Sequence, residues 1–179
     1  MKTYKVVGIG NAVVDVITQS DDSFLANMGI EKGIMQLIEK DRAEVLYGSM
    51  SDRTQAAGGS VANSIAGIGS LGLRTAFVGR VSDDALGKFY AKAMTDEGTV
   101  FVNDPVAGGE LPTSRSMIFV SPDGERSMNT YLGISAELGP EDVAEDVGAN
   151  AEIVFLERHV WRSMFRWVCQ RLRWQHRAQ

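Results

Sequence analysis

The chain has 179 residues, 44% of them hydrophobic and 23% charged, and a formal net charge of −5. These values fit a globular protein with one sizeable core, and the net charge gives no reason to expect nucleic-acid binding. No apolar run approaches the roughly 20 residues of a membrane span, and a single cysteine, Cys169, excludes a disulfide framework within the chain. The N-terminus shows no signal-peptide pattern, so we expect a cytoplasmic protein.

The first 50 residues contain three predicted strands and one helix. The apolar run 5–9 ends in a glycine-rich turn and predicts a buried strand. The β-branched run 13–18 predicts a second strand, and residues 34–38 a third. Asp41, with a glutamate three residues later, is predicted to cap a helix over residues 42–47.

Small residues dominate the next predicted helix. Residues 58–60, Gly-Gly-Ser, open a helix over residues 61–71, which Gly72 is expected to end. A strand follows over residues 74–81, and then a helix over residues 83–95.

Residues 99–156 are predicted to be mostly β-strand. The remaining predicted strands cover residues 99–102, 114–120, 126–131 and 152–156. Residues 121–125, Ser-Pro-Asp-Gly-Glu, predict the turn of a hairpin, and Pro140 begins a short acidic helix. Alternating strands and helices predict an α/β fold with a mostly parallel sheet flanked by helices. The regions 13–38 and 112–133 break that alternation, which predicts a small β appendage.

Three common site types have little support. Gly8-x-Gly10-x-x-Val13 partly matches a dinucleotide-binding fingerprint, but valine replaces the third glycine and a strand is predicted where a helix should begin. A Rossmann-type NAD-binding protein therefore stays an alternative. There is no P-loop pattern. Both histidines and the cysteine lie within residues 158–179, so we predict no metal site.

The segment from Ala57 to Gly72 is the strongest functional signal. Paired glycines let the backbone approach a ligand closely, and the N–H groups of a helix start can donate to a ligand oxygen. Asn63 could present an amide to the same space. The alternative is a glycine turn followed by a tightly packed helix.

This segment resembles the first signature of the ribokinase (PfkB) family, Gly-Gly-x-x-x-Asn followed by a helix and Leu-Gly. Three further stretches resemble the family in the family's own order, and together they cover roughly residues 4–157. They are Gly8–Asp15, Val78–Gly87 with Ser82 in place of a common glycine, and Thr113–Ile134. The opening Asn-Ala-Val-Val-Asp is most similar to the adenosine-kinase-like branch.

The resemblance implies an α/β domain with a small β-sheet lid and ATP-dependent phosphorylation of a sugar or nucleoside hydroxyl, with ATP and Mg²⁺ as cofactors. Asp15 is expected to accept hydrogen bonds from substrate hydroxyls, assisted by Asn11. Gly58, Gly59 and Asn63 should complete the substrate pocket. Arg126 is a possible contact for the transferred phosphate, with a solvated hairpin charge as its alternative.

One family motif is absent from the sequence. The second signature, Asp-Thr-x-Gly-Ala-Gly-Asp, supplies an anion hole and the general-base aspartate, and none of the 179 residues match it. We therefore predict that residues 1–157 form an incomplete ribokinase-like domain, with no catalytic base, no complete ATP site and no kinase activity of its own. The alternative is a non-catalytic sugar- or nucleoside-binding module. The substrate stays open, and a homodimer through the lid or an exposed sheet edge is possible.

Residues 158–179 differ in composition from the rest. They hold six arginines, no acid and all three tryptophans. We expect this basic amphipathic tail not to be family sequence but the product of a frameshift or premature end. The coding DNA tests this, because a shifted frame should restore a kinase-like continuation. The alternative is a genuine basic helix that binds a membrane surface or a partner, or covers a sheet edge.

Overall fold

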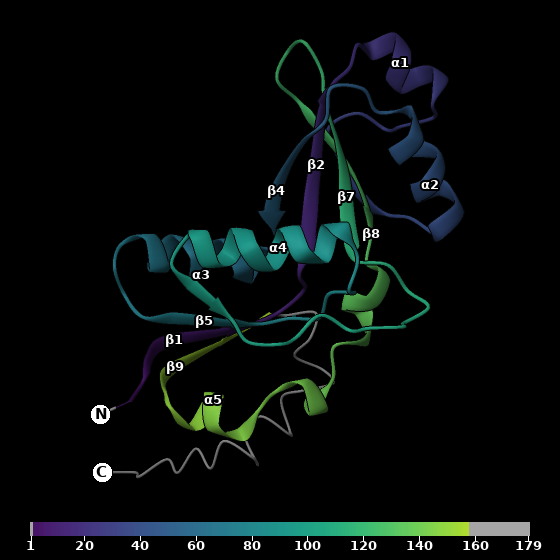
Figure 1. Cartoon of the computed structure of the whole chain (residues 1–179). Helices are drawn as coiled ribbons and strands as arrows, with labels where there is room; N and C mark the ends of the chain where they lie inside the picture. Colours follow the sequence, from purple (N-terminus) through teal and green to yellow (C-terminus); the bar gives the residue numbers. More distant parts are fainter. Residues whose placement is uncertain (1, 158–179) are drawn as a thin grey trace.

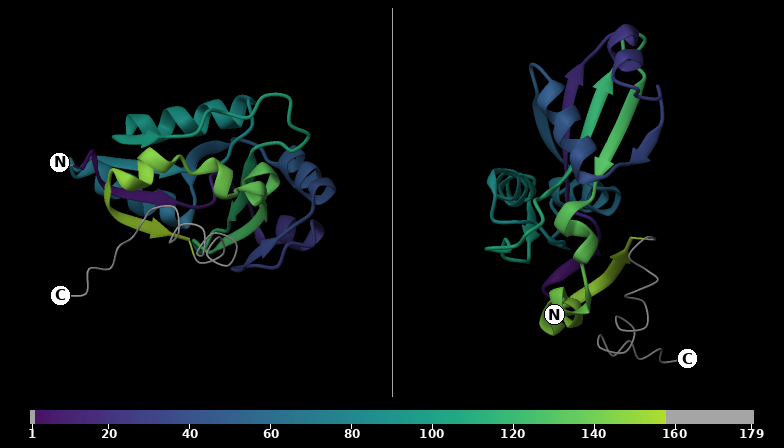
Figure 2. Two further views of the ribbon diagram at one scale, coloured as in Figure 1. Left: turned by 90° about the horizontal axis from the view of Figure 1, so that it is seen from below. Right: turned by 90° about the vertical axis from the view of Figure 1, so that its right-hand side faces the viewer.

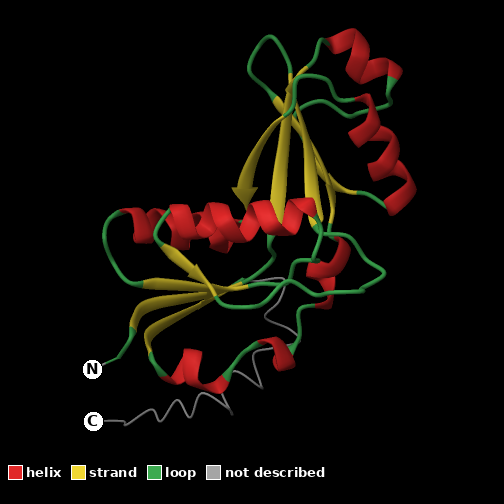
Figure 3. Ribbon diagram, in the orientation of Figure 1, coloured by secondary structure: helices red, strands yellow, loops and turns green. Residues whose placement is uncertain are grey.

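The computed structural model describes residues 2–157, which form two sheets joined at one end (Figures 1 and 3). The first, which we call the core sheet, has four parallel strands in the order β6, β5, β1 and β9. Their bounds are β1 Tyr4–Ile9, β5 Thr75–Val78, β6 Thr99–Phe101 and β9 Ala151–Leu156.

Helices cover both faces of the core sheet. In Figure 1, α3 (Ser60–Ser70) and α4 (Ala85–Asp96) lie on one face and α5 (Glu145–Ala149) on the other. Alternation along β1 explains this, since Val6 packs in the larger hydrophobic cluster while Val7 packs with the residues around α5. Two 3₁₀ helices, η1 (Gly133–Glu137) and η2 (Pro140–Asp142), lead into α5.

The second sheet, which we call the lid sheet, stands on the core and has five strands in the order β3, β8, β7, β2 and β4. Their bounds are β2 Val13–Gln19, β3 Met35–Leu37, β4 Thr54–Gly58, β7 Ser114–Val120 and β8 Arg126–Tyr131. Two helices, α1 (Asp22–Asn27) and α2 (Lys40–Ser49), cover one of its faces (Figure 2). The mixed α/β fold class with a small second sheet is therefore confirmed.

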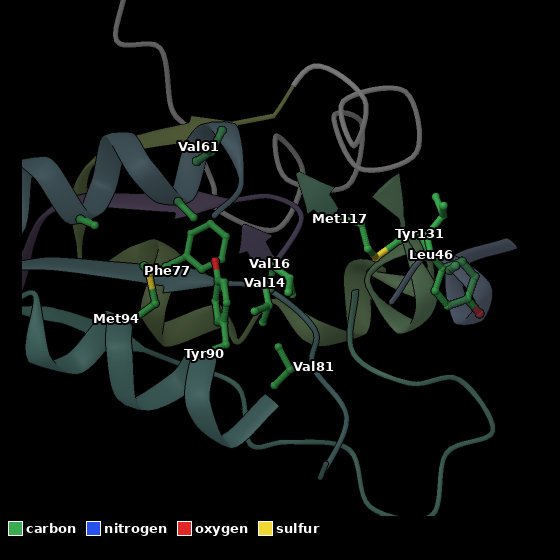
Figure 4. Close-up of a cluster of buried hydrophobic side chains, with 14 of the residues drawn as sticks. Val14, Val16, Leu46, Val61, Phe77, Val81, Tyr90, Met94, Met117 and Tyr131 are labelled. Atoms are coloured by element: carbon green, nitrogen blue, oxygen red, sulfur yellow. The ribbon is translucent and has the colours of Figure 1, made fainter. Parts of the chain in front are cut away.

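Side chains alternate between the two faces of the lid sheet. One face is covered by α1 and α2, and we call the opposite one, which neither of these helices covers, the open face. Val14, Val16 and Met117 belong to the hydrophobic cluster that also contains Leu46 of α2. Figure 4 shows this cluster continuing into the core, where Phe77 and Tyr90 lie between α4 and the core sheet. The side chains between these positions, Asp15 among them, belong to the opposite face.

The observed helix caps correct the predicted start of α2 and explain helix α1, which was not predicted. Asp41 is not the N-cap of α2, because the helix begins at Lys40 and Glu39 takes the cap position. Helix α1 was not predicted, although Asp21 caps it by accepting the Phe24 N–H at 2.7 Å. Strand β4 was not predicted either. The acidic helix expected from Pro140 is interrupted into η2 and α5.

Several predicted turns are confirmed. Gly72 ends α3 with φ +86° and donates its N–H to the Gly69 carbonyl at 2.8 Å. The hairpin turn closes between Ser121 and Glu125. No helix within residues 2–157 is both long and apolar enough to cross a bilayer. The predictions made for residues 158–179 lie outside the described residues.

Candidate functional site

Asp15 lies on the open face of the lid sheet, near the core. A Cβ added at Gly58 would lie 2.6 Å from the atoms of its carboxylate, so the carboxylate occupies the space that a side chain at position 58 would fill. Within residues 2–157 this carboxylate has no hydrogen-bond partner. Burial raises the pKa of Asp15 to about 6, and the positive charge of Arg126 opposes that rise. A partly buried carboxylate without a partner is typical of a ligand-binding position.

Gly59 links the lid sheet to the core. It precedes α3 with φ +106°, and a side chain there would collide with the Asn11 carbonyl oxygen. The carbonyl of the preceding Gly58 is fixed from the other side, because the buried Tyr90 hydroxyl donates to it at 3.0 Å. The glycine pair therefore allows three segments to approach each other beside Asp15.

Asn11 lies in the turn between β1 and β2. Its side-chain Oδ1 accepts a hydrogen bond from the Ser135 hydroxyl at 3.0 Å, and its backbone N–H donates to Glu157 Oε2 at 2.6 Å. Asn63 lies in the first turn of α3 and is exposed. The glycine pair thus connects Asp15, which lies against Gly58, with the backbone carbonyl of Asn11, which lies against Gly59. Asn63 is connected to them through the start of α3, and its amide makes no hydrogen bond within the described part of the chain.

Sequence reasoning missed two residues of this site. Glu157 directly follows β9 and accepts from the Asn11 N–H and, at 2.9 Å, from the Ser60 hydroxyl. Ser135 follows the lid strands and is 1% exposed. A signal for Glu157 was present, because a carboxylate at the carboxyl end of a parallel strand lies where α/β sheets bind ligands. No local signal marks Ser135.

Strand register arranges the open face of the lid sheet in rows. One row pairs Asp15 with Ser116, Thr130 and Leu37. Its two hydroxyls, on Ser116 and Thr130, lie 2.8 Å apart. The next row, farther from the core, is mostly apolar, with Ile17, Ile118, Met128 and Met35 in line and Thr54 of β4 at its end.

Arg126 belongs to a third row on the same open face. Its partner is Val120, which in turn pairs with Gln19, so Arg126 lies beyond the apolar row as seen from Asp15. The guanidinium is exposed and forms no ion pair within residues 2–157. The positive charge of Arg126 acts to lower the pKa of Asp15, and strand register places both residues on the same face of the lid sheet.

The Val78–Gly87 stretch has a structural explanation. Asp84 caps α4 by accepting the Gly87 N–H at 2.8 Å. The same carboxylate accepts from the Thr113 N–H at 2.9 Å and from the Thr113 hydroxyl at 2.8 Å. Asp84 therefore links α4 to Thr113, directly before β7, and its carboxylate is occupied by these hydrogen bonds.

Comparison with known proteins identifies the family. Residues 27–170 match the model of the pfkB family carbohydrate kinases. The chain belongs to this family. That match extends beyond Glu157 into the C-terminal segment.

Several members of the PfkB family resemble the chain over most of its length. It is 46% identical to the adenosine kinase of Sinorhizobium meliloti, with a TM-score of 0.85 over 96% of the chain and 54% of that protein. A probable sugar kinase of Rhizobium etli CFN 42 is 40% identical, with the same TM-score, 97% coverage of the chain and 54% of the relative. Guanosine-inosine kinase of Escherichia coli K12 is 27% identical over 88% of the chain and 38% of its own length. The chain thus spans about half the length, or less, of these relatives.

ATP and Mg²⁺ are the cofactors that membership in a kinase family implies. Asp15 and Glu157 lie at opposite ends of the Asn11 turn, and Glu157 is already bonded to Asn11 and Ser60. Within residues 2–157 no group of three metal-ligating side chains is present. We therefore derive no phosphoryl-transfer step from these residues.

Proposed function

We propose that the family activity underlying this chain is ATP-dependent phosphorylation of a nucleoside hydroxyl, and that residues 1–157 bind the nucleoside. The observation that carries the proposal is Asp15, a partly buried carboxylate without a hydrogen-bond partner in the described part of the chain. A carboxylate can accept hydrogen bonds from two neighbouring hydroxyls of a ribose, and these charge-assisted bonds are short and strong.

The rows of the lid sheet support a nucleoside over a free sugar. The polar row at Asp15 and Ser116 lies near the core and suits a ribose. The neighbouring apolar row at Ile118 and Met128 suits the flat face of a nucleobase. Two relatives of the chain are named for nucleosides, the adenosine kinase of S. meliloti and the guanosine-inosine kinase of E. coli.

We assign the roles of the remaining residues within this proposal. Gly58 leaves room for the Asp15 carboxylate and Gly59 for the Asn11 carbonyl, so the pair positions the ligand-binding groups, and Asn11 and Asn63 are proposed to contribute amides at the border of the pocket. Arg126, on the same open face, is proposed to contact phosphate when the lid sheet closes over the ligand. The 179 residues do not contain the second family signature, so we expect the chain to bind the nucleoside without phosphorylating it.

Substitution of Met128 tests the substrate class. We expect Met128→Ser to weaken adenosine or guanosine binding about tenfold, because burying a methionine contributes about 1.5 kcal/mol or more. Ribose should be bound equally by the wild-type chain and by Met128→Ser, since it does not reach the apolar row. The measurement is isothermal titration calorimetry of the purified chain with adenosine, guanosine, ribose and fructose.

The control for this experiment is Val45→Ser, because Val45 is 57% exposed on α2, which covers the opposite face of the lid sheet. A sugar kinase is favoured instead if ribose or fructose binds more tightly than either nucleoside. Absence of binding by every ligand would contradict the proposed pocket. A coupled kinase assay that detects phosphorylation by the 179-residue chain would show that the expected inactivity is wrong.

Self-association is a further proposal, and exposed apolar side chains support it. On β9, the edge strand of the core sheet within residues 2–157, Ile153 is 52% and Phe155 43% exposed. On β3, an edge of the lid sheet, Met35 is 57% and Leu37 62% exposed. Either edge could pair with a second copy of the chain.

Charged substitutions separate the two edges. If the core edge mediates association, Ile153→Lys should shift the sedimentation profile toward monomer, because a lysine on an edge strand opposes strand pairing. If the lid edge mediates it, Leu37→Lys should have that effect. Analytical ultracentrifugation at several concentrations measures both. A wild-type chain that is monomeric throughout would contradict the proposal.

A further inference from the structure

Within residues 2–157, four segments connect the core sheet to the lid sheet, and three of them meet at Asn11. These three are the turn between β1 and β2, the Gly59–Ser60 step between β4 and α3, and the start of η1 after β8. The contacts of Asn11 therefore determine how the substrate-binding face of the lid sheet is held relative to the core.

Ser135 of η1 holds the Asn11 turn from the lid side. Its Oγ lies 3.2 Å from the Ala12 nitrogen and 3.0 Å from Asn11 Oδ1. A backbone N–H can only donate, so the serine oxygen accepts from Ala12. The hydroxyl hydrogen is then directed to Asn11, whose side-chain oxygen accepts it.

Glu157 holds the same turn from the core side. Its Oε2 accepts the Asn11 N–H at 2.6 Å, and its Oε1 accepts the Ser60 hydroxyl at 2.9 Å. The carboxylate thus bridges two of the connecting segments. Bonds to a charged acceptor are stronger than neutral ones, so the backbone of the turn is anchored independently of Ser135.

The bond from Ser135 leaves one end of the Asn11 amide for other partners. Its Oδ1 is occupied, whereas its Nδ2 makes no hydrogen bond within residues 2–157. The backbone carbonyl of Asn11 lies against Gly59, which adjoins Gly58 beneath the Asp15 carboxylate. Among the described residues, the site therefore offers an acceptor without a partner, Asp15, and a donor without a partner, Asn11 Nδ2.

We infer that Ser135 is a positioning residue that orients the Asn11 amide so that its nitrogen donates to a ligand oxygen beside Asp15. The inference rests on the proposed function, because the ligand is the one that Asp15 binds. A suitable ligand has one hydroxyl that donates to Asp15 and an adjacent oxygen that accepts from Asn11. A pair of neighbouring sugar oxygens has this chemistry.

The experiment compares Ser135→Ala, Asn11→Ala and the double variant by titration calorimetry with adenosine. Loss of one hydrogen bond corresponds to about a fivefold weaker affinity. We expect each single variant to weaken binding by about this factor and the double variant to be no weaker than Asn11→Ala. Additive losses would overturn the inference, because Ser135 would then act independently of Asn11. Ser135→Thr, which keeps the hydroxyl, should restore binding.

The matched control is Ser127→Ala. Ser127 is 0% exposed, and its hydroxyl accepts a backbone N–H from Gly33 at 3.0 Å, as Ser135 does from Ala12. It lies in the lid sheet on the strand β8, away from Asn11. Ser127→Ala should lower the melting temperature but keep the affinity for adenosine. A loss of affinity equal to that of Ser135→Ala would show a general effect of lid stability and would overturn the inference.

Two measurements separate failure of this inference from failure of the proposed function. If wild type binds adenosine, Asp15→Asn does not, and Ser135→Ala binds like wild type, only the role of Ser135 is wrong. The second measurement needs no ligand. NMR of the free chain should show the Asn11 side-chain amide ordered in wild type and mobile in Ser135→Ala, with faster exchange of the Ala12 amide. Unchanged Asn11 and Ala12 signals would overturn the inference even if no ligand binds.

Discussion

Asp15→Asn is expected to abolish most nucleoside binding and, at pH 7, to make the chain more stable. Two charge-assisted hydrogen bonds to the ligand would be weakened, which corresponds to about 2 kcal/mol or about a 30-fold loss of affinity. In the free chain the carboxylate is partly buried without a hydrogen-bond partner among the described residues, and asparagine removes that buried charge. Calorimetric titration and thermal unfolding at pH 7 measure the two effects.

The pH dependence of stability follows from the raised pKa of Asp15. Its pKa is about 6 in the folded chain and 3.8 in an unperturbed aspartate. The folded state therefore binds a proton more readily than the unfolded state. The destabilisation by the charged carboxylate is fully present above pH 6 and is relieved as the pH falls from 6 toward 4. The stability gain of Asp15→Asn over wild type should shrink over the same interval.

Asp104→Asn is the control, because Asp104 is exposed and forms no ion pair within residues 2–157. It should change neither affinity nor the pH dependence. In Arg126→Gln the pKa of Asp15 should rise further, because the opposing positive charge is removed. An Asp15→Asn variant that is less stable than wild type at pH 7 would contradict this account of the site.

Two glycine-to-alanine substitutions, one just before α3 and one within it, should have opposite effects on stability. Gly59→Ala places a side chain at φ +106° and against the Asn11 carbonyl oxygen. Such a backbone conformation costs about 1–3 kcal/mol for a residue with a Cβ, and the collision adds to it. We expect strong destabilisation, with displacement of Asn11 from Asp15 and loss of ligand binding.

Gly67→Ala is the matched partner, since Gly67 lies within α3 and a Cβ there would meet no atom within 4 Å. Alanine should stabilise the helix by about 0.5–1 kcal/mol and leave ligand affinity unchanged. Chemical denaturation of both variants gives the two free energies of unfolding. Equal effects of the two substitutions would show that the Gly59 conformation is not required.

The sequence predicted the elements whose signals are local. The β-branched run of β2 and the Pro-Asp-Gly turn between β7 and β8 determine their own conformations, and both were found. Strand β4, with the sequence Thr-Gln-Ala-Ala-Gly, has no strong strand propensity. It is a strand because it pairs with β2, which is decided by tertiary contacts.

The residues of the candidate site also fall into those that a local motif indicates and those that only tertiary contacts bring to the site. Resemblance to the family pointed to Asp15 and the Gly58-Gly59 pair, because each lies within its own short, contiguous family motif. Ser135 and Glu157 could not be found by that route. Each bonds to Asn11 from more than 120 positions away, and no sequence spacing encodes such a contact.

By itself the amino-acid sequence determined the alternation of strands and helices, the family and the residue types available to a ligand, since these depend on neighbouring residues. Only the tertiary structure decided that Asp15 lacks a partner among the described residues, that the lid sheet has a polar row beside an apolar one, and that Ser135 occupies one end of Asn11. The physical reason is that burial, strand register and hydrogen-bond pairing arise where distant segments meet.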